Sequence, residues 1–170
     1  MSHVRVEEIV RFMDTAFDGS RWHSILANLK DVAPEDYGWA PPGSGDDIGR
    51  SIQGMVRHLA AAKHVYHNQA FGDGTLRWPD IQPRLTNPDA TMQDDLDWLH
   101  AGHRLLRASV AALEDDDLDT ERPTHMGPLL PTRSIVSIMI EHDMYHAGEI
   151  NHLRAIRPDT DYWAGARRQS

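Results

Sequence analysis

The sequence contains no cysteine, which limits both how the fold is held together and what chemistry it can perform. No disulfide can staple the chain, and no protein thiolate can bind a metal or act as a nucleophile. Any thiol chemistry therefore requires a thiol from outside the protein. The chain also lacks an apolar run of about 18 residues and an N-terminal signal-peptide core. We expect a cytoplasmic protein with no membrane partner.

Basic residues are scarce relative to acidic ones. The chain has 17 Lys and Arg against 26 Asp and Glu, which gives a formal net charge of −9. Such a surface repels nucleic-acid phosphates, and the one short arginine cluster, near the C-terminus, is better explained as a solvated helix end. The sequence therefore predicts no nucleic-acid partner. Its 170 residues fit a single domain, with a core at about residues 4–156 and a tail at 157–170.

No stretch shows the apolar-polar alternation of a β-strand, whereas helical spacing of apolar residues recurs along the chain. This spacing predicts helices at about residues 4–32, 47–70, 91–113 and 132–156. Gly19 interrupts the first helix, Asp46 or Asp47 can cap the second, and Thr132 can cap the last. Residues 71–90 contain three prolines and two glycines, and their length suits a crossover between parallel helices. The predicted fold class is all-α, a four-helix bundle with a long crossover between helices two and three.

The last predicted helix carries two imidazoles within its apolar stripe. His142 and His146 are one turn apart, which places both near the middle of the apolar face and within reach of one ion. Each would need a hydrogen-bond partner or a metal there, because an unpaired buried polar group costs about 1–3 kcal/mol. A third imidazole from a neighbouring helix would complete a metal site with positions left for water or substrate. His58, on the second helix, is the first choice for this third ligand.

Other patterns around these histidines favour different interpretations. His64 and His67 point to other sides of the second helix and are expected at the surface. His103 lies in the apolar stripe of the third helix, where a hydrogen-bonded core histidine competes with a metal ligand or a pocket acid or base. A zincin motif, H-E-x-x-H, is excluded, because position 143 would have to be glutamate and is aspartate. A di-iron carboxylate bundle is also excluded, because the second helix carries no acidic residue after its cap.

Three stretches of the chain together resemble one known family. HDMYHAGEINHLR at residues 142–154, VRHLAAAKHVY at residues 56–66 and FDGSRWHSIL at residues 17–26 resemble the DinB/YfiT-like superfamily of four-helix-bundle metalloenzymes. The match covers nearly the whole chain in order. Glu149 stands where the family usually has glutamine, and its carboxylate can orient a histidine, join the metal or pair with an arginine.

The resemblance implies a fold, a metal site and a type of reaction. The family fold is a four-helix bundle in up-down-down-up order, and many members are homodimers. Its members bind a divalent transition metal, such as Zn or Ni, through three histidines that match His58, His142 and His146. Characterised relatives include transferases and isomerases that use low-molecular-weight thiols such as mycothiol, bacillithiol or glutathione. A thiol cosubstrate is therefore expected alongside the small-molecule substrate.

These observations lead to a hypothesis of Lewis-acid catalysis. The metal would activate a low-molecular-weight thiol or water for transfer to a small electrophilic substrate. His103, Tyr145 or Glu149 would move the proton as catalytic residues. The alternative is a non-catalytic bundle that binds a metal or small ligand in a stress response. A third hypothesis is a structural bundle that dimerises through helix faces and whose histidines are only hydrogen-bonded.

Overall fold

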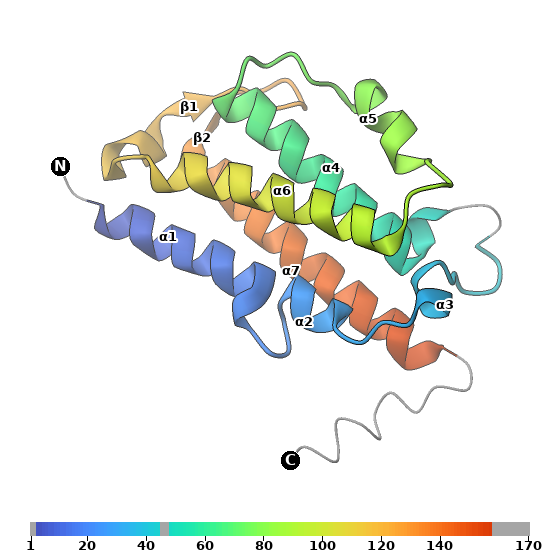
Figure 1. Cartoon of the computed structure of the whole chain (residues 1–170). Coiled ribbons are helices and arrows are strands. Elements are labelled where there is room, and N and C mark those ends of the chain that lie inside the picture. Colours follow the sequence, from blue (N-terminus) through green and yellow to red (C-terminus); the bar gives the residue numbers. More distant parts are fainter. Residues whose placement is uncertain (1–2, 45–47, 158–170) are drawn as a thin grey trace.

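The computed structural model of the protein describes residues 3–44 and 48–157 (Figure 1). The α-helices of this part are α1 (Val4–Asp14), α2 (Ile25–Leu29), α3 (Pro34–Tyr37), α4 (Ile52–Phe71), α5 (Trp78–Leu85), α6 (Met92–Ala111) and α7 (Thr132–Ile156). The predicted all-α class is confirmed, apart from a short ladder in which β1 (Glu121–Arg122) pairs antiparallel with β2 (Leu130–Pro131). Among these described residues, no helix combines the length and apolar composition that a membrane crossing requires.

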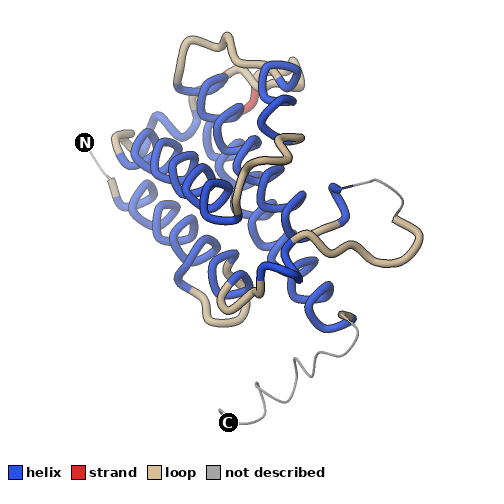
Figure 2. Tube along the Cα trace, turned by 45° about the vertical axis from the view of Figure 1, so that its right-hand side comes forward, coloured by secondary structure: helices blue, strands red, loops and turns tan. Residues whose placement is uncertain are grey.

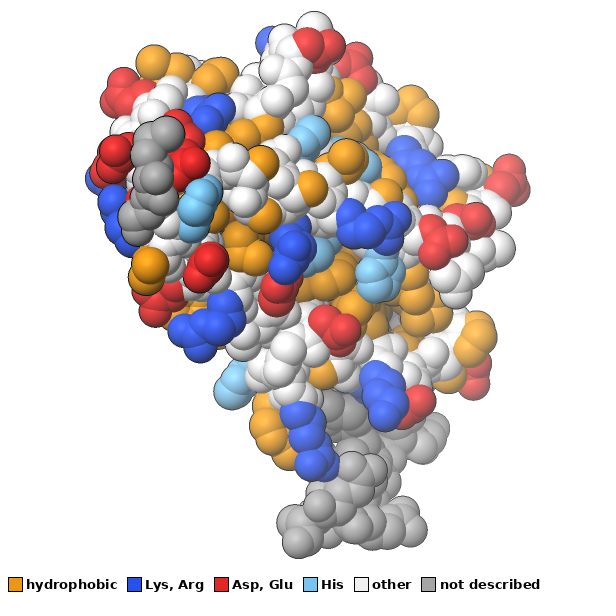
Figure 3. All heavy atoms as spheres, turned by 60° about the vertical axis from the view of Figure 1, so that its left-hand side comes forward, with side chains coloured by type: hydrophobic (Ala, Val, Ile, Leu, Met, Phe, Trp, Pro, Cys, Tyr) orange, Lys and Arg blue, Asp and Glu red, His pale blue; other side chains and the backbone are white. Residues whose placement is uncertain are grey.

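The longest helices lie side by side, as Figures 1 and 2 show. α4 packs against both α6 and α7, and α1 packs against the same two helices. α4 and α6 run in one direction, while α1 and α7 run in the other (Figure 1). Acidic and basic side chains are interspersed on the face drawn in Figure 3, where histidine rings also reach the surface.

The helix starts differ from the sequence prediction at two places. Ser51 caps α4, since its hydroxyl accepts a hydrogen bond from the Gly54 N–H at 3.0 Å. The predicted caps Asp46 and Asp47 lie outside the described residues. The prediction for Thr132 was wrong, because this residue is the first of α7 and its hydroxyl donates to the Thr120 carbonyl at 2.9 Å. That bond fastens the start of α7 to the segment that leads into β1.

The crossover between α4 and α6 is more ordered than the sequence suggested. The crossover after α4 contains α5, which begins where the Asp80 carboxylate accepts a hydrogen bond from the Arg77 N–H at 2.8 Å.

The predicted interruption near Gly19 is confirmed, because α1 continues into a π-helical turn over Thr15–Gly19 and Ser20 is extended. A separate short helix, α2, then covers one end of α7.

Two buried ion pairs join α4 to its neighbours. Nζ of Lys63 lies 2.7 Å from Oδ2 of Asp143 on α7, and both side chains are at most 4% exposed. Nε of Arg57 lies 2.8 Å from Oδ2 of Asp95 on α6, and both are at most 2% exposed. A charge so deep in the core is tolerated only with its partner, so these pairs fix α4 relative to both helices.

We expect Lys63→Met to lower the free energy of unfolding by about 3 kcal/mol or more, since it leaves the Asp143 carboxylate buried and unpaired. The double variant Lys63→Met/Asp143→Leu should recover most of that loss, because it removes both charges. Urea denaturation of purified protein would measure both effects.

A half-exposed pair provides the matched control. Arg107 on α6 binds Asp14 on α1 through two hydrogen bonds of 2.6 and 2.8 Å, with both side chains more than 40% exposed. Arg107→Met should therefore cost only about 1 kcal/mol or less. Equal losses in Lys63→Met and Arg107→Met would contradict a special role for the buried pair.

Candidate metal centre

Three imidazoles converge where α4 faces α7. Nε2 of His142 lies 3.1 Å from Nε2 of His58 and 3.0 Å from Nε2 of His146. One nitrogen from each ring can be chosen so that all three lie within 4.8 Å of one another. Each side chain is half-buried. The structure thus brings together the three ligands expected from the sequence.

This arrangement fits a divalent transition metal. Three ligand nitrogens that hold a tetrahedral ion at about 2.0–2.1 Å lie about 3.3 Å apart, close to the distances found here. Burial lowers the pKa of all three imidazoles, and the pKa of His142 falls to about 3. Neutral rings are the form that binds metal, and three of them suit Zn²⁺, Ni²⁺, Co²⁺, Fe²⁺ or Cu²⁺.

The sequence placed His142 and His146 near the middle of the buried face of α7, and this detail was wrong. Asp143 and Ala147 are the more deeply buried, with exposed fractions of 3% and 1%, whereas His142 and His146 are half-buried at the side of the face. The ion pair between Asp143 and Lys63 explains the shift, because it turns the carboxylate toward α4. The edge position leaves the imidazoles accessible from the surface, as a site for exogenous ligands requires.

Glu149 and Tyr145 lie beside the histidine cluster. Oε2 of Glu149 is 2.7 Å from Nδ1 of His146, a close electrostatic contact whose alignment is poor for a hydrogen bond. The nearby Glu149 carboxylate also raises the pKa of Tyr145. Tyr145 is 63% exposed. The carboxylate therefore connects a metal-ligand candidate to a solvent-facing hydroxyl.

His103 lies in a different environment. Its ring stacks on Phe17 at 3.7 Å between centroids and 5° between planes, and its Nε2 is 3.9 Å from Oδ1 of Asp14. Only 6% of the residue is exposed. The contacts described for His103 connect α6 to the end of α1 and do not include the three clustered histidines.

The two histidines expected at the surface of α4 are in fact half-buried against α6. His64 contacts the Trp98 carbonyl at 3.2 Å through Nε2, and His67 contacts the Ser109 hydroxyl at 3.1 Å through Nε2. The surface prediction was wrong because α4 packs on two helices, so more than one of its faces is covered.

Two cavities reach the histidine cluster. The first, which we call the aromatic cavity, has a volume of about 360 Å³ and is lined by His58, His142, Trp78, Tyr66, His125 and Tyr145 among others. The second, the glycine-lined cavity, has a volume of about 340 Å³ and is lined by His58, His146, Gly49, Gly54, Gln82 and Thr86 among others. His58 contributes to both, so a metal held by the cluster would be approached from two directions.

His125 was missed in the sequence because it belongs to no periodic pattern. It lies in the connection between β1 and β2, where prolines and a glycine surround it. The only available signal was a histidine in a turn-forming segment, and turn chemistry does not reveal which cavity a side chain lines.

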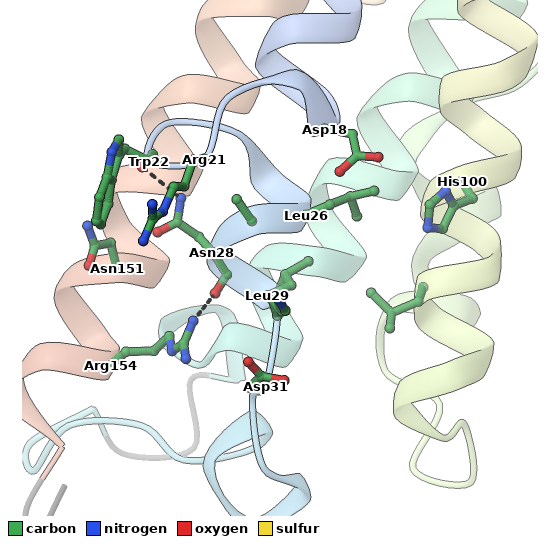
Figure 4. A pocket seen from close by; sticks show the side chains of 13 residues that line it. Asp18, Arg21, Trp22, Leu26, Asn28, Leu29, Asp31, His100, Asn151 and Arg154 are labelled. Carbon is green, nitrogen blue, oxygen red and sulfur yellow. Dashed lines mark hydrogen bonds between the residues drawn. The ribbon is translucent and has the colours of Figure 1, made fainter. Parts of the chain in front are cut away.

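A larger cavity lies elsewhere on the molecule. It has a volume of about 710 Å³ and is lined from α2, α6 and α7, as Figure 4 shows. Asn28 lies within it, where its carbonyl accepts a hydrogen bond from Nη1 of Arg154 at 2.7 Å. None of the three clustered histidines lines this cavity. Its size alone does not make it the reactive site, because it contains no comparable gathering of metal-ligand atoms among the described residues.

Comparison with known proteins agrees with the resemblance seen in the sequence. A family model described as the DinB superfamily matches residues 18–150, which is more than half of the chain. The matched region includes all three clustered histidines. No significant match to a curated protein was found.

The neutral state of His103 makes the stability of the fold depend on pH. Burial, reinforced by the Lys63 ammonium, lowers the pKa of His103 from 6.5 to about 3. Between these values the unfolded chain binds a proton here and the folded protein does not, so this residue weakens folding as pH falls below about 6.5. When the pH falls from 7 to 5, we expect the free energy of unfolding of wild type to drop by about 2 kcal/mol more than that of His103→Gln. Urea denaturation at the two pH values measures this difference.

The exposed His23 provides a control, because His23→Gln changes the same residue type without removing a buried ring. The free energy of unfolding of His23→Gln should change with pH as that of wild type does. An unchanged pH dependence in His103→Gln would contradict the buried neutral state.

Proposed function

Because the chain belongs to the DinB superfamily, we propose that it is a metal-dependent enzyme whose His58, His142 and His146 hold a divalent transition ion such as Zn²⁺ or Ni²⁺. The observation that carries the proposal is the convergence of three Nε2 atoms, with successive distances of 3.1 and 3.0 Å. Three neutral nitrogens leave at least one coordination position for an exogenous ligand. An open position of this kind is typical of a catalytic rather than a structural site.

The reaction we propose is transfer of a low-molecular-weight thiol, or of water, to a small electrophilic substrate. A bound metal ion would supply Lewis acidity, which lowers the pKa of the thiol or water. The chain itself provides no cysteine, so the thiol is a cosubstrate. The two cavities that meet at His58 support a reaction of two components, since each component has a separate approach.

The proton released from the nucleophile has a path through the chain's own residues. Oε2 of Glu149 lies 2.7 Å from Nδ1 of His146, the Glu149 carboxylate raises the pKa of Tyr145, and Tyr145 lines the aromatic cavity. We propose that Glu149 orients His146 and accepts the proton released by the nucleophile, and that Tyr145 passes a proton between this carboxylate and substrate or solvent. We propose that His103 stays outside this path, because its ring stacks on Phe17 and its Nε2 lies beside Asp14.

We further propose that α1, α4, α6 and α7 form the up-down-down-up bundle of the family and that the protein is a cytoplasmic homodimer. The helix directions in Figure 1 support the first proposal. The homodimer is supported by a cavity of about 320 Å³ between α1 and α7, which is lined by Phe12, Ile140 and Met144 among others. Phe12 and Met144 are nearly half exposed, so pairing of this face with a second copy would bury apolar surface.

Elemental analysis of tag-free protein tests the metal proposal. We expect nearly one metal ion per chain in wild type and near-complete loss in both His58→Ala and His142→Ala, because two imidazoles hold such ions far less tightly than three. His67→Ala is the matched control, since it changes a half-buried histidine of the same helix that contacts Ser109 instead. Wild type that takes up no metal on reconstitution would overturn the proposal.

A screen of wild type with small thiols and a generic electrophile then distinguishes the two functional hypotheses. Thiol-dependent turnover that disappears in His142→Ala would support the enzyme. Bound metal without turnover would favour the alternative, a non-catalytic metal- or ligand-binding bundle.

Replacement of Glu149 by glutamine tests its role beside His146. If the carboxylate orients the ligand, Glu149→Gln should weaken metal binding by about 10- to 100-fold in a competition with a chelator of known affinity. Tyr145→Phe is the control, because it removes the hydroxyl while the carboxylate stays. Unchanged metal affinity in Glu149→Gln would show that Glu149 does not orient His146.

A further inference from the structure

His58 and His146 differ in what holds their rings beside the cluster. The Glu149 carboxylate lies 2.7 Å from Nδ1 of His146, whereas Nδ1 of His58 has no hydrogen-bond partner among the residues that the structure describes. His58 has a ring contact instead. The indole of Trp78 stacks on it, with the ring planes 13° apart and the centroids 5.6 Å apart. A metal-bound imidazole is usually oriented by a partner at its other nitrogen, so the indole is the contact that can take this role for His58.

The segment before Trp78 is anchored to the end of α4. Nε2 of Gln69 donates to the Leu76 carbonyl at 2.8 Å, and Oδ1 of Asn68 accepts a hydrogen bond from the Leu76 N–H at 2.8 Å. Trp78 follows two positions later as the first residue of α5, and α5 packs against α4. These bonds therefore fix where the indole meets the helix that carries His58.

The rest of α5 is fixed to α4 as well. Arg57, directly before His58, donates through Nη1 to the carbonyl of Leu85, the last residue of α5, at 3.0 Å. Ile81, in the middle of α5, is 6% exposed and packs with buried apolar side chains of α4. The helix that begins with Trp78 is therefore held at both ends and along its length, so the stacked contact with His58 has a defined geometry.

A second ring contact holds the indole of Trp78. His125 packs edge-on against it, with centroids 5.8 Å apart and an angle of 74°, and also against Tyr66, with centroids 4.7 Å apart. Edge-to-face and stacked arrangements are both favourable for such rings. A continuous row of rings results, in the order Tyr66, His125, Trp78 and His58. The row begins and ends on α4, so a tilt of the indole is resisted by rings at both of its contacts.

The turn that carries His125 is also fixed to the bundle. The Gly127 N–H donates to the Thr124 carbonyl at 3.1 Å, which closes the chain around His125. Nη1 of Arg122 donates to the Ala70 carbonyl at the end of α4 at 3.2 Å, and its Nε donates to the hydroxyl of the first residue of α7 at 2.9 Å. The ring that packs on the indole therefore comes from a well-anchored segment.

We propose that Trp78 is a positioning residue of the metal site, which holds the His58 imidazole by stacking so that its Nε2 faces Nε2 of His142. This inference deepens the proposed function and rests on it, since it concerns how His58 presents its nitrogen to the ion. Stacking uses the face of the imidazole and leaves the nitrogen at its edge free, 3.1 Å from the nitrogen of His142. The indole therefore orients the ring without competing for the atom that would bind the metal.

The metal affinity of Trp78 variants tests the inference. In a competition with a chelator of known affinity, we expect Trp78→Leu to bind Zn²⁺ about two- to tenfold more weakly than wild type, the effect of one lost ring stack. Trp78→Phe keeps an aromatic face and should recover most of the affinity. Ile81→Ala is the matched control, because it loosens the packing of α5 without removing the stacked ring and should leave the affinity for Zn²⁺ unchanged.

Three results would overturn the role of Trp78. The first is equal affinity for Zn²⁺ in wild type and Trp78→Leu. The second is an equal loss in Trp78→Leu and Ile81→Ala, because the placement of α5 and not the stacked ring would then determine the affinity. The third is a loss in Trp78→Phe as large as that in Trp78→Leu, because an aromatic face would then make no difference.

NMR of the metal-free protein separates this inference from the proposed function. The ring protons of His58, assigned by their loss in His58→Gln, should change in chemical shift in Trp78→Leu and not in Ile81→Ala, because the field of an aromatic ring acts at short range. This dependence in a wild type that takes up no metal would overturn the metal function and leave the stacked pair standing. Stoichiometric metal with identical His58 shifts in wild type and Trp78→Leu would overturn the inference and leave the metal site standing.

Discussion

The buried ion pair between Lys63 and Asp143 is the constraint on which the arrangement of the site depends. It joins α4 to α7 at 2.7 Å with both side chains nearly inaccessible to water, and neither charge can remain there without the other. The pair therefore fixes how far one helix is shifted and rotated against the other. Asp143 follows His142 directly in the chain, so the orientation of the carboxylate toward α4 determines where the neighbouring imidazole lies. This is how a single contact brings histidines from two helices to one point.

α4 supports the site at more than one position. Arg57, directly before His58, binds Asp95 through Nε and donates to the carbonyls of Leu85 and Ala90 through its other nitrogens. These bonds secure the crossover that contains α5, and α5 provides walls for both cavities at the histidine cluster. The guanidinium can satisfy three acceptors at once because its donors have a fixed planar geometry. Of two successive residues of α4, His58 thus lines both cavities and Arg57 secures the crossover that covers them.

Helical periodicity predicted what depends on local sequence and failed where contacts between distant residues decide. The spacing of His142 and His146 was enough to predict a shared ion, because one helical turn always brings such residues together. The same spacing misplaced them on the buried face, because it cannot account for an aspartate that enters the core with a lysine from 80 residues away. His125 escaped prediction for a related reason. Its position is set by the Arg122 contacts and by a turn, neither of which has a periodic pattern.

The chemistry of the cluster follows from the balance between burial and access. Desolvation disfavours a proton on each imidazole, and the mutual proximity of the rings disfavours it further for His142 and His58. Each neutral ring therefore has one nitrogen with a free lone pair at neutral pH, and three Nε2 atoms that meet at about 3 Å are compatible with a cation that all of them share. Deeper burial would strengthen the neutral state but would close the cavities that reach the cluster. The two α7 histidines are half-buried, so their rings stay neutral and remain accessible from these cavities.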